Sequence, residues 1–213
     1  VPGEIADQVL LAQNDMGRRV TNIVGMGQGE PFLNYRNVLA ALRILNDPQG
    51  LAIGARHISI STCGVIEGIE RFSHEPEQFT LAVSLHAARQ STRDLLMPRV
   101  ARYKLPDLKQ ALMRYVKKTN RRVTLEYVMI DNVNDTDRDL EALNAFCSDL
   151  LCHVNLIPIN AVEGSPFQPS DPLVLDQWVQ SIQSHGKEAT VRDSRGSDID
   201  GACGQLKRTK CFT

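Results

Sequence analysis

The sequence predicts an α/β protein with a parallel sheet, and three observations support this fold class. Runs rich in β-branched residues alternate with segments whose apolar residues recur at helical spacing. Such alternation predicts parallel strands joined by crossover helices. Polar residues directly follow the strands, and parallel α/β folds and barrels place their sites at these carboxyl ends. A barrel therefore fits the sequence slightly better than an open sheet.

Six strands and five helices are expected in order along the chain. The strands cover residues 20–24, 57–61, 79–85, 123–128, 153–159 and 188–191, of which the last gives the weakest signal. The first helix covers residues 3–16, and Asn34 is placed to cap the second. Pro106 suits the first turn of the third helix, and Thr136 with Asp139 starts the fourth. The apolar residues expected to face inward are Ile5, Val9 and Ala12; Val38, Leu42 and Leu45; Leu108, Leu112, Tyr115 and Val116; Leu140, Leu143, Cys147 and Leu150; and Leu175, Val179 and Ile182.

Length and charge set broad limits on function. The 213 residues are enough for one domain with a sizeable core. The formal net charge of -1, from 24 basic and 25 acidic residues, gives no overall field that favours nucleic acid, although local basic clusters leave such binding open. No apolar run approaches the roughly 18 residues of a membrane span. A monomer without a membrane partner is expected.

The cysteines indicate a reducing compartment. The chain contains five of them at irregular spacing, which argues against a secreted disulfide framework. No Cys-x2-Cys or Cys-x3-Cys-x2-Cys pattern occurs, so neither a zinc site nor an iron–sulfur site has support within this sequence. Reduced thiols and a cytoplasmic location are therefore expected. The five are Cys63, Cys147, Cys152, Cys203 and Cys211.

A glycine-rich run, residues 25–34, follows the first predicted strand. A dinucleotide fingerprint would need a helix to open directly on the glycines, but Glu30-Pro31 follows and the helical pattern begins only near Tyr35. A tight turn without function is a second interpretation. We favour a third, in which Gly29 and Glu30 offer carbonyl and carboxylate acceptors to a cationic amino group.

Cys203 stands apart from the other cysteines because of its neighbours. Ala202 and Gly204 give its sulfur little steric cover. Arg192 and Arg195 favour a thiolate, whereas three nearby aspartates oppose it. The residues alone leave a nucleophilic cysteine and an unreactive one equally open.

The other polar strand-end residues carry a weaker signal when taken singly. A serine such as Ser61 at a strand end is usually a local cap, and a histidine such as His86 after a strand is more often structural. Asn160 is a turn residue by default. Cys63 ends the second strand beside a glycine, where we expect it near a site without a catalytic role.

Taken together, the motifs resemble one family across nearly the whole chain. The chain is similar to the radical S-adenosylmethionine (SAM) RNA methyltransferases of the RlmN/Cfr group, and its adenine-C2 branch looks closer than the C8 branch. The matching motifs, in order, are Met26-Gly-Gln-Gly-Glu-Pro31, Ser61-Thr-Cys-Gly-Val65, Ser84-Leu-His-Ala87, Glu126-Tyr-Val-Met-Ile-Asp131, Val133-Asn-Asp135, Cys152-His-Val-Asn-Leu-Ile-Pro158 and Ala202-Cys-Gly-Gln-Leu206.

The resemblance implies a fold, a cofactor site and a reaction. The fold would be a partial (β/α)6 radical SAM barrel with SAM at the strand carboxyl ends. Cys203 would carry the methyl group as S-methylcysteine, and a radical generated from a second SAM at a 4Fe–4S cluster would pass it to adenine C2. The implied partners are 23S rRNA, tRNA and an electron donor such as flavodoxin. The residues implied to bind SAM are Gly29, Glu30, Ser61, Ser84, Leu85, His86 and Asn160.

The chain departs from the family pattern at its start. We expect residues 1–213 to form a single, incomplete barrel domain that lacks the first strand, the cluster loop with its three cysteines and the N-terminal RNA-binding region. Alone, it is expected to be inactive. A decayed or split-gene remnant that binds SAM or RNA without turnover is the main alternative. An unrelated α/β enzyme with a thiol nucleophile is a third.

Overall fold

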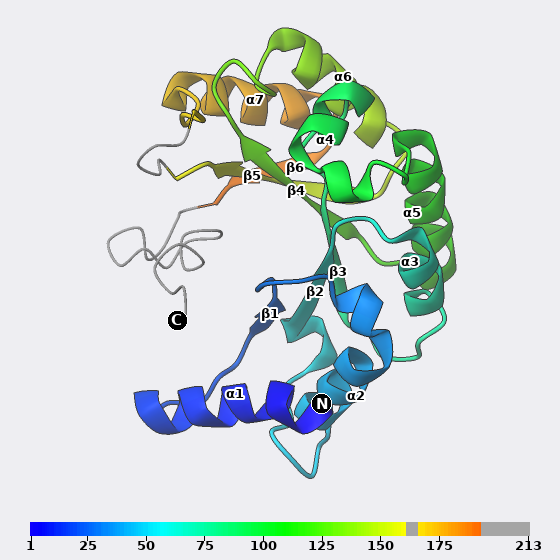
Figure 1. The fold of residues 1–213 in the computed structure, drawn as a ribbon, viewed down its shortest axis with the longest axis vertical. Helices are drawn as coiled ribbons and strands as arrows, with labels where there is room; N and C mark the ends of the chain where they lie inside the picture. Colours follow the sequence, from blue (N-terminus) through cyan, green and yellow to red (C-terminus); the bar gives the residue numbers. More distant parts are fainter. Residues whose placement is uncertain (161–165, 193–213) are drawn as a thin grey trace.

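The computed structural model describes residues 1–160 and 166–192, which form one curved parallel sheet with helices on its outer side (Figure 1). The six strands pair in sequence order, so every neighbour in the sheet is also the neighbour along the chain. They are β1 (Ile23–Gly25), β2 (Ile58–Thr62), β3 (Thr80–Ser84), β4 (Val123–Met129), β5 (Cys152–Pro158) and β6 (Glu188–Val191).

The helices follow the strands around the outside of this sheet, as Figure 1 shows. Three short 3-10 helices, η1 (Pro31–Asn34), η2 (Ala55–His57) and η3 (Pro98–Val100), lie in the connections. The α-helices are α1 (Pro2–Met16), α2 (Tyr35–Asn46), α3 (Ile66–Phe72), α4 (Gln90–Leu96), α5 (Leu105–Thr119), α6 (Asp137–Cys147) and α7 (Pro172–Ser184).

This arrangement confirms the predicted α/β class and the barrel type of sheet. A doubly wound sheet would carry helices on both faces and would reverse its strand order at a switch point. Here the order runs from β1 to β6 without reversal, and the helices cover the convex face. No helix within the described ranges is both long enough and apolar enough to cross a membrane.

Within residues 1–160 and 166–192 the structure has the six strands that the sequence predicted, but some of the predicted boundaries are wrong. The first strand begins at Ile23 instead of residue 20, because the Val20 N–H bonds to the Gln13 side chain at 2.9 Å and stays with α1. The second begins at Ile58, because the His57 N–H closes a turn onto the Gly54 carbonyl at 2.8 Å. The remaining strands agree with prediction to within two residues at each end.

Two predictions about helices need correction. The sequence patterns missed α3 and α4, which have seven residues each and are too short to show helical periodicity. Asn34 occupies the N-cap position of α2 but makes no capping hydrogen bond with the backbone. Its side-chain oxygen accepts from the Asn37 amide at 2.7 Å instead. Thr136 caps α6 as predicted, by accepting from the Asp139 N–H.

Strand β4 shows how the two faces of the sheet differ. Successive side chains of a strand point to opposite faces. Tyr127 points toward the helices, where its ring lies 5.3 Å from the ring of Trp178 on α7. Glu126, the preceding residue, therefore points to the concave face, where it bonds to Asn155 of the paired strand β5. The core thus lies between sheet and helices, and the concave face carries polar side chains.

Candidate functional site

The segment after β1 is shaped by glycines and ends at a fixed carboxylate. Gly29 has a φ of +99°, in the region that favours glycine, and a side chain built there would meet open space. Glu30 follows, and its Oε1 accepts from the Phe32 N–H at 2.9 Å, which caps η1. The backbone beside Glu30 is therefore open to a ligand, while the carboxylate is held in place.

Cys63, which follows β2, holds the second oxygen of this carboxylate. Its backbone N–H and its thiol both donate to Glu30 Oε2, each at 2.7 Å. Burial, and then the hydrogen bond to Glu30, raise the pKa of the thiol to about 12. Cys63 is therefore a protonated donor at neutral pH, which makes it a poor nucleophile and a good support for Glu30.

Two predicted site serines meet on neighbouring strands. The hydroxyls of Ser61 on β2 and Ser84 on β3 lie 3.4 Å apart, and both side chains are partly buried. Ser84 pairs in register with Glu126 of β4. The concave face thus carries a polar row that runs across neighbouring strands at their carboxyl ends.

Glu126 extends this row and was not predicted as a site residue. It is buried, and its Oε2 accepts from the Asn155 amide at 2.8 Å. The side-chain oxygen of Asn155, Oδ1, in turn accepts from the Thr190 hydroxyl at 3.3 Å. Burial raises the pKa of the Glu126 carboxyl. From the sequence, Glu126 was named only as the first residue of a matching motif, although a charged residue inside an apolar strand was the available signal.

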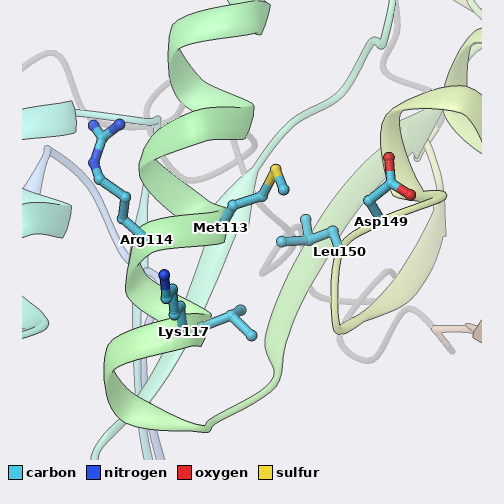
Figure 2. Close-up of a pocket in the computed structure, with 6 residues that line it drawn as sticks. Met113, Arg114, Lys117, Asp149 and Leu150 are labelled. Atoms are coloured by element: carbon cyan, nitrogen blue, oxygen red, sulfur yellow. The ribbon is translucent and has the colours of Figure 1, made fainter.

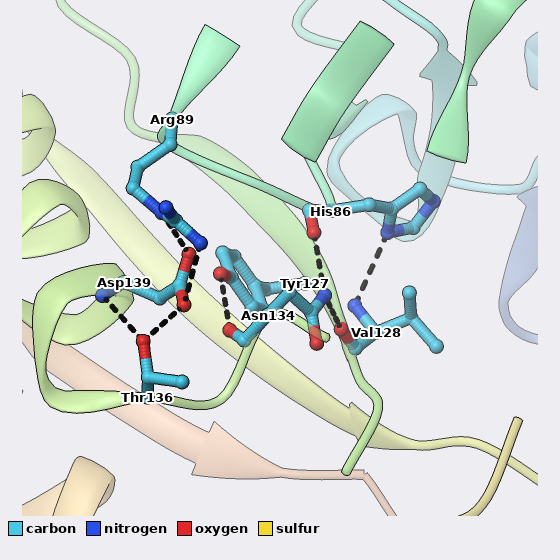
Figure 3. Close-up of polar contacts among 7 residues, drawn as sticks. All are labelled: His86, Arg89, Tyr127, Val128, Asn134, Thr136 and Asp139. Carbon is cyan, nitrogen blue, oxygen red and sulfur yellow. Dashed lines mark hydrogen bonds and ion pairs between the residues drawn. The ribbon is translucent and has the colours of Figure 1, made fainter. Parts of the chain in front are cut away.

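His86 turns the chain after β3 and is fixed as a neutral ring. It has a φ of +55°, and its Nδ1 accepts from the Val128 N–H at 3.1 Å (Figure 3). Burial lowers the pKa of the ring to about 4. Because Nδ1 is an acceptor, the proton of the neutral ring lies on Nε2. Leu85, also predicted at the site, buries its side chain in the core, and only its backbone lies along this edge of the sheet.

Asn134 ties His86 to the rest of the fold. Its amide nitrogen donates to the carbonyls of His86 at 2.7 Å and Val128 at 2.6 Å (Figure 3). Its side-chain oxygen accepts from the Ile130 N–H at 2.8 Å. The Tyr127 hydroxyl donates to its backbone carbonyl at 2.7 Å. No sequence signal placed Asn134 beside His86, because 48 residues separate them.

Arg93, on α4, reaches the same edge from the helix layer. It is fully buried, and its Nη2 donates to the Cys63 carbonyl at 2.7 Å. Its Nε and Nη1 have no hydrogen-bond partner in the described part of the chain. Sequence reasoning missed this residue, since an arginine on a short helix gives no indication of burial.

The structure brings together most of the predicted site residues. Glu30, Ser61, Ser84 and His86 lie on or directly after neighbouring strands, all at the carboxyl ends. Asn160 follows β5 at the same edge and is partly exposed. Cys203 and Cys211 lie outside the described residues. Across the described ranges, no group of three His, Cys, Asp or Glu side chains is arranged to hold a metal ion.

A pocket on the described part of the protein lies away from this edge. It has a volume of about 320 Å³ and lies between α5 and the loop after α6 (Figure 2). None of the predicted site residues lines it. Its lining is apolar with charged ends, and comprises Met113, Arg114, Val116, Lys117, Asp149 and Leu150. The polar and titratable side chains therefore indicate the carboxyl edge, and not this pocket, as the candidate site.

Comparison with known proteins gives a consistent match. The Radical SAM superfamily matches residues 2–143. A probable dual-specificity RNA methyltransferase RlmN from Alkaliphilus metalliredigens is 45% identical over 206 residues, which cover 97% of this chain and 58% of that protein. The same-named protein from Moorella thermoacetica is 47% identical over 92% of this chain and 56% of its own length.

One solved structure agrees with the sequence matches. A radical SAM methyltransferase from Sphaerobacter thermophilus superposes with a TM-score of 0.92 at 46% identity, covering 96% of this chain and 61% of that one. The chain therefore spans less than two thirds of the length of each of these three proteins.

Proposed function

The chain belongs to the Radical SAM superfamily, and from that premise we propose that it is the SAM-binding barrel of an RNA methyltransferase of the RlmN type. The observation that carries the proposal is the Glu30 carboxylate, held rigidly beside open glycine backbone at the carboxyl edge of the sheet. The relatives, whose printed names state this activity, support the assignment to RNA methylation.

Glu30 is proposed to bind the ammonium group of SAM. Each carboxylate oxygen carries two lone pairs. Oε1 accepts one bond, from the Phe32 N–H, and so keeps acceptor capacity, whereas Oε2 already accepts two bonds from Cys63. The carbonyl of Gly29 offers a further acceptor. A charge-assisted hydrogen bond of this kind contributes roughly 1.5–3 kcal/mol. The positive φ at position 29 favours glycine, and because glycine has no side chain the approach to this carbonyl stays open.

The polar row is proposed to bind the remainder of SAM. Ser61 and Ser84 each offer a hydroxyl that can donate or accept. His86 offers Nε2–H as a donor, because Nδ1 is occupied by the Val128 N–H. Leu85 is proposed to contribute its backbone and Asn160 its side chain.

Cys203 is proposed to carry the methyl group. Its sulfur would take the methyl group of one SAM, with a new S–C bond formed and S-adenosylhomocysteine released. A 4Fe–4S cluster, when bound, supplies the electron that converts a second SAM to a radical source. The sequence holds no Cys-x3-Cys-x2-Cys pattern, so its residues do not fit a cluster by themselves. The proposed acceptor is adenine C2 of 23S rRNA and tRNA, with flavodoxin or a similar protein as electron donor.

The cofactor assignment is tested by the affinity of this chain for SAM. In equilibrium dialysis with labelled SAM, Glu30→Gln is expected to bind about 10- to 100-fold more weakly than the wild type, because a charge-assisted bond becomes a neutral one. Glu141→Gln, which changes an exposed glutamate on α6, is the matched control and should bind normally. Equal affinity in Glu30→Gln would remove Glu30 from the cofactor site.

The methyl transfer is tested on the protein isolated from its source. A peptide mass spectrum should show an S-methyl group on Cys203, and Cys203→Ala should abolish methyladenosine formation while SAM binding remains. An unmodified Cys203 in a protein of 23.7 kDa would instead identify a barrel remnant without turnover.

A further inference from the structure

Arg93 carries a buried positive charge that the described protein does not neutralise. Its side chain is fully buried, and no carboxylate in residues 1–160 and 166–192 forms an ion pair with it. The adjacent Asp94 bonds to Gln90 at 2.6 Å and to Lys104 at 3.3 Å instead. Burying a charge without a partner is costly, so a buried charge of this kind calls for an explanation.

The nearby Arg89 shows how proteins usually offset the cost of burying an arginine, which is to pair it with a carboxylate. Its guanidinium makes two hydrogen bonds to the buried Asp139, at 2.6 and 3.2 Å. Two arginines four positions apart therefore have opposite surroundings. Arg89 is matched to an acid, whereas Arg93 makes one hydrogen bond, to the carbonyl of Cys63.

That single bond places Arg93 two contacts away from the proposed ammonium site. Arg93 holds the Cys63 carbonyl at 2.7 Å, and Cys63 holds Glu30 Oε2 through both its N–H and its thiol. Gly64 makes the close approach possible, because a β-carbon there would lie 3.2 Å from Arg93 Nη2. Its φ of +100° lies in the region that favours glycine, and the Cys63 carbonyl before it faces Arg93 while the Cys63 N–H faces Glu30.

We infer that Arg93 is a positioning residue for SAM, which fixes the orientation of Cys63 and, through it, the carboxylate that receives the ammonium group. The inference rests on the proposed function. A buried guanidinium cannot swing into solvent, so it locks the Cys63 peptide more firmly than a surface contact would. Because its Nε and Nη1 are buried as well, Arg93 supports the site from behind without touching the ligand.

The test compares three ligands on the intact chain. SAM has both an ammonium and a carboxylate group, decarboxylated SAM has only the ammonium, and 5′-methylthioadenosine has neither. We expect Arg93→Met to weaken SAM and decarboxylated SAM to the same degree, by about tenfold, and to leave 5′-methylthioadenosine unchanged. Arg93→Lys, which keeps a charge and a donor, should restore part of the affinity. Arg114→Met, on the outer face of α5, is the matched control and should bind all three ligands normally.

Stability and coupling distinguish positioning from a general structural role. The urea midpoint of Arg93→Met should be no lower than that of the wild type, because an unneutralised buried charge is removed along with one hydrogen bond. If Arg93 acts through Glu30, the double variant Glu30→Gln with Arg93→Met should bind SAM no more weakly than Glu30→Gln alone.

Each of the following outcomes would contradict either the positioning role of Arg93 or the ammonium site itself. A loss confined to SAM would mean that Arg93 acts on the ligand carboxylate. Equal loss for all three ligands with a lower urea midpoint would mean a structural role, and unchanged affinity would remove Arg93 from the site. A wild-type chain that binds 5′-methylthioadenosine and not SAM would refute the ammonium site itself, and with it the proposed function.

Discussion

Two polar networks lie along the same edge of the sheet, and they differ in how completely their groups are paired. The Asn134 network (His86, Asn134 and Tyr127, with Arg89, Thr136 and Asp139 beside it) pairs its buried groups with one another (Figure 3). The Glu30 network (Glu30, Phe32, Cys63 and Arg93) leaves acceptor capacity on a carboxylate and two buried nitrogens of an arginine without partners. Paired groups stabilise a fold, whereas the free acceptor capacity of Glu30 remains available to a ligand, with the unpaired Arg93 nitrogens buried behind it.

This difference predicts that the two networks respond differently to substitution. Changes in the Asn134 network at residues other than His86, whose Nε2–H is proposed to bind SAM, should lower the free energy of unfolding and leave SAM affinity per folded molecule intact. Changes in the Glu30 network should lower SAM affinity and leave the free energy of unfolding nearly unchanged. The predictions below test this separation, and Glu30→Gln and Arg93→Met belong to the second group.

The largest effect on stability is expected from Asp139→Ala. Asp139 is fully buried in the first turn of α6, and it accepts two bonds from Arg89 and one from the Thr136 hydroxyl. Removing one partner of a buried ion pair costs roughly 3–5 kcal/mol. Urea unfolding should therefore show a loss of about 3 kcal/mol or more. Asp137→Ala, an exposed position in the same helical turn, should change stability by about 0.5 kcal/mol or less.

A measurement of SAM affinity tests whether the effect of Asp139→Ala is confined to the stability that the Asn134 network provides. The folded fraction of Asp139→Ala should bind SAM as the wild type does, because no hydrogen bond or ion pair among the described residues links Asp139 or its partners to Glu30. A large fall in SAM affinity with little change in unfolding free energy would contradict the separation of the two networks.

A smaller loss of unfolding free energy, of about 2 kcal/mol, is expected from the Asn134 network when the pH is lowered to 5. The folded pKa of His86 is about 4, below its unfolded value of about 6.5, so the native state binds fewer protons than the unfolded state between these limits. The stability from His86 is therefore fully present above pH 6.5 and is lost as pH falls toward 4. At pH 5 the loss amounts to about 2 kcal/mol.

The pH effect can be separated from the titration of other groups. Unfolding free energies measured at pH 7.5 and 5 should differ less in His86→Gln, which keeps a side-chain acceptor for the Val128 N–H, than in the wild type. An identical pH dependence in both proteins would mean that His86 is not the group that titrates.

The sequence predicted the features of these networks that depend on neighbouring residues. It did not predict contacts between residues that are far apart along the chain. Glu30 was identified because its signal is local, a glutamate after glycines at a strand end. Its support by Cys63 involves a residue 33 positions away, and Arg93 lies 30 positions beyond that. Only the tertiary fold brings them together, and nothing in a short helix such as α4 marks one arginine as buried and another as paired.

The fold itself was largely predictable because its signals are periodic. Apolar runs identified all six strands, and the order of elements gave the barrel type of sheet. Boundaries failed where one specific hydrogen bond decides them, as with Gln13 and Val20 before β1. Leu85 was proposed at the site from its place in a motif, and its side chain is in the core because side chains alternate along a strand.

The smallest effect is expected at Cys63, where a single side-chain donor supports Glu30. Cys63→Ala removes the thiol bond and keeps the backbone N–H on the same carboxylate oxygen. SAM affinity should fall by about threefold, in line with the loss of one modest hydrogen bond, with unfolding free energy changed by about 1 kcal/mol or less. Cys63→Ser keeps a donor and should bind within about twofold of the wild type. If Cys63→Ala instead binds SAM more tightly, the thiol competes with the ammonium group for Glu30, and support of the carboxylate comes from the backbone and Arg93 alone.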